Sequence, residues 1–264
     1  EIMAMLDRIS LMNGQPVSFP TICSVHGETL HNHSYKNTLK KGQLLLVDAG
    51  SESPLCYATD HTRTSPVGGK FTNQQREIYQ IVLDANNAVA AACEPGLTYR
   101  EMHLMACRII AGGLKELGIM KGDMDDAVME GAHALFMPHG IGHMLGLDVH
   151  DMEDLGENIV GYDADQSRSP QLGLGSLRMA RRLKPGNVIT DEPGIYFIPS
   201  LIELWKKEGT DKGHVNYDAL AAYYDFGGIR LEDDILVTPE GARRIGSSRL
   251  PISVEEVENA MAND

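Results

Sequence analysis

The sequence predicts a mixed α+β domain. Two observations predict it: helix-type patterns lie between strand-type patterns, and strand-type segments gather late in the chain. With 264 residues, 42% of them hydrophobic and 23% charged, the chain can bury a sizeable core. We find no internal repeat and no obvious linker, so residues 1–264 are treated as one domain.

The first predicted elements form a hairpin. Residues 43–47 contain four consecutive apolar residues, 44–47, and end at Asp48, which is typical of a buried strand. Residues 50–54 carry the Gly, Ser and Pro of a turn, and residues 55–64 are expected to form the returning strand. The two arms therefore carry one aspartate each, Asp48 and Asp60.

Helices are expected next. Thr72 followed by Gln75 forms a capping box before apolar residues at helical spacing, and Pro95 ends that pattern. The same capping signal recurs at Thr98 and predicts a second helix. Residues 123–132 predict a third.

The second half of the chain is less regular. Residues 138–150 are rich in glycine and histidine, and residues 151–174 read as a polar, acidic loop. A short strand is expected at 188–190, and residues 229–237 resemble one central strand that carries four charges. Residues 201–224 predict no clear element.

Charge and cysteine usage limit the partners and the compartment. The chain has 23 basic and 37 acidic side chains, a net charge of −14. Such a surface repels phosphate backbones and anionic lipids, so we expect no nucleic-acid partner and no membrane association. The four cysteines form no CxxC pair, which favours free thiols and a cytoplasmic location.

Several acids stand in apolar surroundings and need neutralising partners. Asp48, Glu192 and Glu232 follow or interrupt apolar strand patterns, and an unpaired carboxylate in a core is very unfavourable. An ion pair with Arg230, on the same strand face as Glu232, would satisfy only one of them. Divalent metal ions would satisfy all of them, because carboxylates and imidazoles bind Mn, Co and Zn.

Histidines are concentrated in one glycine-rich segment. His139, His143 and His150 lie within 12 residues, which favours a binding role over isolated structural histidines. The spacing of Gly140 and Gly142 alone could indicate a dinucleotide loop, but no GxGxxG follows and no strand–helix frame precedes it.

Five ordered motifs carry a resemblance to a known family. They are Val47-Asp48-Ala49-Gly50, Thr59-Asp60-His61-Thr62-Arg63-Thr64 with Val67-Gly68-Gly69-Lys70-Phe71-Thr72, the histidine segment Pro138 to Asp151, Asp191-Glu192-Pro193-Gly194-Ile195-Tyr196, and Gly228-Ile229-Arg230-Leu231-Glu232-Asp233-Asp234. In this order they resemble the catalytic domain of the pita-bread metallopeptidases, above all prolidase (Xaa-Pro dipeptidase) and aminopeptidase P. The resemblance spans nearly the whole chain and implies the pita-bread fold, a curved antiparallel sheet covered by helices.

The resemblance also implies two divalent metal ions, usually Mn, with Co or Zn as alternatives. The matching ligands are Asp48, Asp60, His143, Glu192 and Glu232. In the family, the counterpart of Asp48 binds one metal, those of Asp60 and Glu232 bridge both, and the other two complete the second. Such ions would lower the pKa of a bridging water, and Glu192 would relay its proton.

The implied reaction is hydrolysis of an Xaa-Pro peptide bond, in a dipeptide or a longer proline-containing peptide. His150 would donate a hydrogen bond to the oxyanion, and His31 and His139 match family histidines that position the substrate. Arg178 resembles the arginine that receives the free carboxylate of a dipeptide. Arg230 matches an arginine that hydrogen-bonds among the ligands.

Alternatives remain open. Aminopeptidase P acts on longer peptides and needs a cleft with an open end, and Arg178 favours the dipeptidase unless it belongs to a solvated basic face with Arg181, Arg182 and Lys184. Methionine aminopeptidase fits two of the segments poorly. Creatinase-like hydrolases and the non-catalytic peptide- or histone-binding modules of this fold lack the complete ligand set.

Three features depart from the family pattern. The interval from Asp48 to Asp60 is one residue longer than usual, and Asp191 stands where Val or Ile is common. The family also has an amino-terminal domain that aids dimerisation and covers the active site, and we expect it to be absent here. We therefore expect a truncated start, a longer whole protein, and a homodimer at full length.

Overall fold

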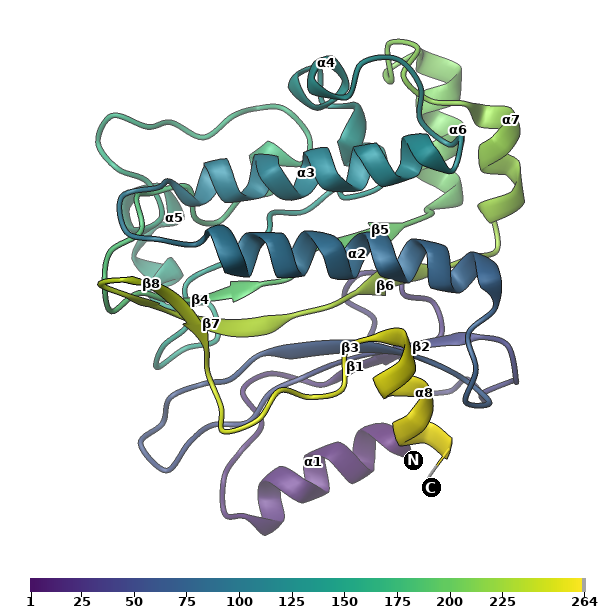
Figure 1. Ribbon diagram of the computed structural model, residues 1–264. Helices are drawn as coiled ribbons and strands as arrows, with labels where there is room; N and C mark the ends of the chain where they lie inside the picture. Colours follow the sequence, from purple (N-terminus) through teal and green to yellow (C-terminus); the bar gives the residue numbers. More distant parts are fainter. Residues whose placement is uncertain (263–264) are drawn as a thin grey trace.

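The computed structural model describes residues 1–262 and has helices packed against short antiparallel strands, in agreement with the α+β prediction (Figure 1). Its α-helices are α1 (Ile2–Met12), α2 (Asn73–Ala92), α3 (Tyr99–Glu116), α4 (Met124–Met129), α5 (Glu157–Val160), α6 (Pro199–Glu208), α7 (Tyr217–Leu220) and α8 (Val254–Ala262), and its 3-10 helices are η1 (Ala132–Leu135), η2 (Glu153–Leu155), η3 (Leu174–Ser176) and η4 (Ala221–Tyr223). Its strands are β1 (Ile22–Ser24), β2 (Leu44–Ala49), β3 (His61–Pro66), β4 (Val188–Asp191), β5 (Gly194–Tyr196), β6 (Gly228–Arg230), β7 (Asp233–Thr238) and β8 (Gly241–Arg244).

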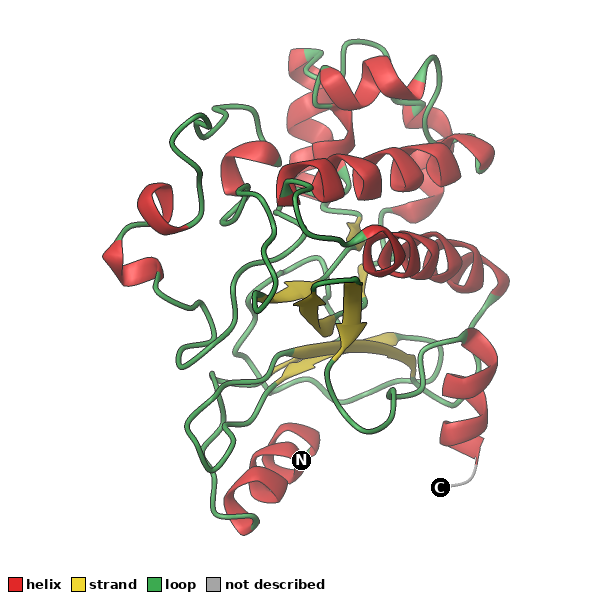
Figure 2. Cartoon of the chain, turned by 60° about the vertical axis from the view of Figure 1, so that its left-hand side comes forward, coloured by secondary structure: helices red, strands yellow, loops and turns green. Residues whose placement is uncertain are grey.

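The strands of the described chain pair in three antiparallel groups, β1-β2-β3, β4-β7-β8 and β5-β6. α2 and α3 lie side by side on one side of the strands, and α1 lies beyond β1–β3 on the other side (Figure 2). The main core lies between the helices and the strands, and is filled by side chains such as Ile78, Val82, Ile110 and Ile235. Within the described residues, every helix is too short or too polar to span a bilayer.

The predicted hairpin is present, but its second strand is shorter than expected. β3 begins at His61, because the chain closes a loop over residues 53–57 first: the peptide N–H of Ser53 donates to the carbonyl of Tyr57 (2.8 Å), and Cys56 has a φ of 63°. This loop lies within the interval between Asp48 and Asp60.

Both predicted capping boxes are confirmed. The Thr72 hydroxyl accepts the Gln75 peptide N–H at the start of α2, and Thr98 does the same at the start of α3. The third predicted helix, 123–132, ends earlier than expected: α4 stops at Met129, and Gly131, with a φ of 86°, turns the chain into η1.

The prediction of one strand over residues 229–237 is wrong. The structure forms two strands, because β6 pairs with β5 while β7 pairs with β4, and Leu231 and Glu232 lie between them. Opposite this break stands Pro193, which has no N–H to donate to a ladder. The residues left outside the ladder include Glu192 and Glu232.

Other elements carry little local signal. The unassigned segment 201–224 holds most of α6 and all of α7 and η4, and α1, α8 and the short strands β1, β5 and β8 were not predicted. Short strands are defined mainly by their partners, which a local pattern does not show.

Candidate metal centre

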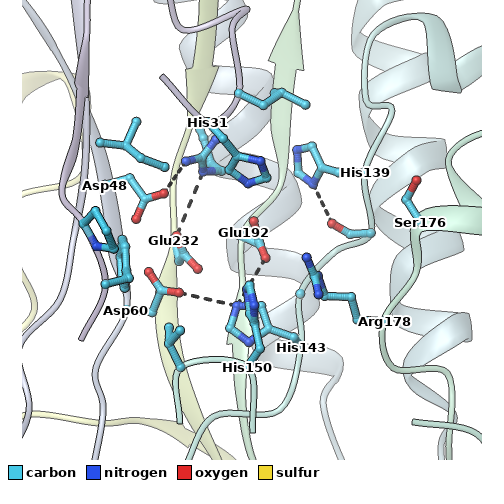
Figure 3. Close-up of a pocket in the computed structure, with 18 of the residues that line it drawn as sticks. His31, Asp48, Asp60, His139, His143, His150, Ser176, Arg178, Glu192 and Glu232 are labelled. Carbon is cyan, nitrogen blue, oxygen red and sulfur yellow. Dashed lines mark hydrogen bonds and ion pairs between the residues drawn. The ribbon is translucent and has the colours of Figure 1, made fainter. Parts of the chain in front are cut away.

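One cavity of about 670 Å³ opens beside the broken strands (Figure 3). It is bordered by residues from the hairpin, from the histidine segment and from the breaks between strand pairs. All ten site residues predicted from the sequence line it, namely His31, Asp48, Asp60, His139, His143, His150, Arg178, Glu192, Arg230 and Glu232.

The hairpin positions the two aspartates. Asp48 lies in β2, Asp60 directly precedes β3, and the pairing of Ala49 with His61 brings them to the same end of the hairpin. Both side chains are buried. Burial raises the pKa of Asp60 well above its ordinary value, and the negative charge of Asp48 acts in the same direction.

His143 points its Nε2 at the carboxylates. Its peptide N–H donates to the Thr190 hydroxyl (3.1 Å), and its Nδ1 lies 3.0 Å from the carbonyl oxygen of Met144. With Nδ1 as the donor to that carbonyl, Nε2 carries the lone pair. It lies 3.4 Å from Oδ2 of Asp60 and 3.8 Å from Oε1 of Glu192.

Glu192 and Glu232 enter the cavity from the breaks in the strand ladders. The Thr62 hydroxyl donates to Oε2 of Glu232 (2.6 Å). Burial raises the pKa of Glu192 to about 7, although His143 and Arg230 act against the increase. The pKa of Glu232 is raised well above its ordinary value by burial and by the charges of neighbouring carboxylates.

This donor set fits divalent metal. One donor atom each from Asp60, His143 and Glu232 lies within 4.8 Å of the other two. Within residues 1–262, Oδ1 of Asp48 and Oδ1 of Asp60 are buried without a hydrogen-bond partner. Buried oxygens without partners and clustered like charges are unfavourable in protein alone, and divalent cations would satisfy both, because carboxylate and imidazole are their usual ligands.

Arg230 connects Asp48 to Tyr196 and, through it, to His139. Its Nη2 donates to Asp48 (2.6 Å), its Nε to the Thr62 hydroxyl (3.0 Å), and its Nη1 to the Tyr196 hydroxyl (3.1 Å). That hydroxyl lies 2.9 Å from Nε2 of His139. Thr62 and Tyr196 were missed as site residues; both lie inside motifs seen in the sequence, but their contacts depend on distant strands.

The remaining histidines border the cavity. The ring of His150 meets the ring of His143 edge-on, with centroids 4.5 Å apart. Burial lowers the pKa of His150 to about 3, and His143 adds to the effect. His31 lies at the exposed rim.

Arg178 lines the cavity but has acidic partners. Its Nη1 pairs with a carboxylate oxygen of Glu153 and lies 3.4 Å from Oε1 of Glu157. Its neighbours Arg181 and Arg182 pair instead with Asp163, away from the cavity. These three arginines are therefore paired with carboxylates of the acidic loop at residues 151–174. Of the three, Arg178 is the one that lines the cavity.

Asp191 points away from the cavity. It is fully buried in β4 and is absent from the cavity lining. Among the described residues, neither of its carboxylate oxygens has a hydrogen-bond partner. Burial raises its pKa well above the ordinary value, and the charge of Asp233 on the facing strand adds to the effect.

Comparisons with known proteins agree with this geometry. Residues 1–239 match the family described as metallopeptidase family M24. The chain is 40% identical over 225 residues to the Xaa-Pro dipeptidase of Homo sapiens, which covers 85% of this chain and 44% of the human protein. It thus spans less than half the length of that relative.

Solved structures show the same fold. Aminopeptidase PepP of Pseudomonas aeruginosa is 32% identical with a TM-score of 0.77, over 98% of this chain and 51% of that one. Zinc-substituted Escherichia coli aminopeptidase P in complex with product is 35% identical with a TM-score of 0.72, over 94% and 48%. These likenesses confirm the expected pita-bread fold.

Proposed function

The chain belongs to metallopeptidase family M24, and we propose that it hydrolyses Xaa-Pro dipeptides as a prolidase. The observation that carries the proposal is the cavity itself, where five ligand-type side chains converge beside Arg178. The dipeptidase name of the human relative supports this choice. Because this chain covers less than half of that relative, the activity is proposed for the whole protein.

The proposed ligands of two divalent ions, preferably Mn with Co or Zn as alternatives, are Asp48, Asp60, His143, Glu192 and Glu232. When bound, the ions supply an activated water and an electrophile for the scissile carbonyl. Glu192 is proposed to accept a proton from the attacking water at its carboxylate and to donate it to the proline nitrogen that leaves, since it lies beside His143 at the edge of the proposed ligands.

The other side chains position the substrate. His150, against the ring of His143, is proposed to donate a hydrogen bond to the oxyanion. His139, held by Tyr196, and His31 at the rim would orient the peptide. Arg178 would receive the carboxylate of the dipeptide in exchange for Glu153.

The second candidate is aminopeptidase P activity on longer peptides. One observation favours it: Glu153 and Glu157 already pair with Arg178 and compete with a substrate carboxylate. The aminopeptidase names of the solved relatives point the same way.

We also propose a homodimer at full length and a cytoplasmic location. The family resemblance supports the first. The four cysteines, all within the described chain and all free thiols, support the second. We further propose that the partner is a peptide, rather than a nucleic acid or a membrane, on the basis of the net charge of −14.

The test is cleavage of Gly-Pro beside Gly-Pro-Ala by the whole protein, with added Mn and with a metal-stripped control. Cleavage of the dipeptide alone supports the prolidase, and cleavage of the tripeptide moves the assignment to aminopeptidase P. Glu192→Gln should abolish turnover while keeping the fold, so Mn-dependent turnover in that variant would contradict the assignment.

A paired substitution tests Arg178. Arg178→Met should raise KM for Gly-Pro, because the substrate carboxylate loses its bidentate partner. Arg182→Met removes a neighbouring guanidinium that pairs with Asp163 and Asp165 at the surface, and should leave KM unchanged. Equal changes in KM for the two substitutions would show that Arg178 acts only through its positive charge and does not bind the substrate carboxylate.

A further inference from the structure

A second group of side chains of metal-binding type is buried between α3 and η1, outside the lining of the cavity. His103 and Cys107 stand four residues apart on α3 and therefore share a face of the helix, and η1 brings His133 against them. The Sγ of Cys107 lies 3.4 Å from Nε2 of His103. One donor atom from each of the three residues lies within 4.8 Å of the other two.

These side chains are buried with too few partners. All three have an exposed fraction of 0%. Within the described residues, Nδ1 of His103 has no hydrogen-bond partner, and neither ring nitrogen of His133 makes a hydrogen bond of ordinary geometry. A buried polar atom without a partner is unfavourable for folding. The contact between Cys107 and His103 accounts for one of the four ring nitrogens, and the backbone of Val128 near His133 accounts for at most one more, so at least two have no partner in the described chain.

Both imidazoles are in the form that binds metal. Burial lowers the pKa of His103 to about 3, with His133, His139 and Arg100 acting in the same direction. Burial also lowers the pKa of His133 to about 4, although the nearby backbone of Val128 opposes the change. Neutral rings offer a lone pair to a cation.

We propose that His103, Cys107 and His133 bind one thiophilic metal ion, copper(I). Binding would transfer the Cys107 proton to solvent and form a sulfur–copper bond. One thiolate, two neutral imidazoles and a monovalent ion carry no net charge, which a buried site favours over a dication. The three donors also suit copper(I), because structural zinc takes four ligands.

The proposed ion would tie α3 to the segment that leads into the candidate metal centre. η1 ends at Leu135, four residues before His139. A metal–ligand link at His133 would therefore fix the start of the histidine segment against α3. Because the group is sealed from solvent, the ion would enter during folding or through local opening.

The test is the copper content of the whole protein. The protein is purified under anaerobic conditions from cells grown with added copper. X-ray absorption at the copper edge should show one sulfur and two imidazole nitrogens around each copper. The ligands of the candidate metal centre are oxygen and nitrogen only, so sulfur identifies this second group. Cys107→Ser should lose the sulfur-bound copper, while Cys56→Ser, which removes an exposed thiol, should keep it.

A second variant separates binding from folding. His133→Gln keeps the cysteine, and when its circular dichroism matches the wild type it should bind copper(I) about tenfold more weakly or worse. Copper without a sulfur ligand, wild-type protein without copper, or sulfur-bound copper retained in Cys107→Ser would overturn the proposal. Sulfur-bound zinc that copper(I) cannot displace would overturn the choice of a monovalent ion.

Discussion

Two aspartates that face each other across β4 and β7 have opposite environments. The carboxylate of Asp233 forms ion pairs with three arginines. Its oxygens lie 2.6 Å from a guanidinium nitrogen of Arg63, 2.6 Å from one of Arg244 and 3.2 Å from one of Arg249. Burial alone would raise its pKa, but these guanidinium groups outweigh burial and lower it. Asp191, its register partner, is fully buried, and within residues 1–262 its carboxylate has no hydrogen-bond partner. The same residue type is therefore expected to stabilise one strand and destabilise the other.

We predict that Asp191→Val raises the melting temperature and that Asp233→Asn lowers it. Valine suits a buried strand position, and removing an unpartnered polar group recovers roughly 1–3 kcal/mol, or about 2–4 °C for each kcal/mol in a domain of this size. Asparagine at 233 would leave three arginines, Arg63, Arg244 and Arg249, without the carboxylate that they share. Thermal unfolding in excess Mn measures both, and a lower melting temperature for Asp191→Val would contradict the account.

At the scale of elements, the buried carboxylate of Glu258 links α8 to the start of α2. Oε1 of Glu258 accepts the peptide N–H of Phe71 (3.0 Å) and pairs with Arg76, and Oε2 lies 2.9 Å from Nζ of Lys70. Burial would raise the pKa of Glu258, but Lys70, the Phe71 N–H and Arg76 together lower it.

We predict that this contact stabilises the fold at neutral pH and is lost in acid. A lowered pKa means that the unfolded chain binds a proton first, so the contribution is complete above the ordinary glutamate pKa of about 4.3 and disappears as pH falls through the lower folded value. Glu258→Gln should therefore reduce the melting temperature at pH 7, and the gap to the wild type should narrow below about pH 4. A difference in melting temperature that stays constant over this pH range would show that Glu258 acts through packing and not through its charge.

Elements with local signals were predictable, and those defined by distant partners were not. Thr72 and Thr98 mark their helices through contacts three residues away, so the sequence alone placed both starts. The break after Arg230 depends on Pro193, which is remote in sequence, and was missed. The site followed the same division: the five proposed ligands were named from residue type within motifs and line one cavity, whereas the contacts of Tyr196 required the folded arrangement.

At the scale of the whole molecule, the cluster of proposed ligands joins two parts of the fold. Asp48 and Asp60 come from the β1-β2-β3 group, while Glu192 and Glu232 come from the junctions between the other two groups. Hydrogen bonds also cross this boundary, since the Glu232 peptide N–H donates to the Thr62 carbonyl (3.0 Å). In the absence of metal, the carboxylates repel one another across the same boundary.

We predict that removing divalent metal lowers the melting temperature by roughly 10 °C, because a ligand at 1,000 times its Kd stabilises the native state by about 4 kcal/mol. Asp60→Asn provides the decisive comparison. In a chelator it should melt higher than the wild type, since one of the repelling charges is gone, while the increase on adding Mn should shrink because a ligand is lost. Asp125→Asn, an exposed aspartate paired with Arg108, should change neither value. Equal metal-induced increases in melting temperature in the wild type and in Asp60→Asn would show that the ions bind elsewhere. Metal would then not stabilise the boundary between the strand groups.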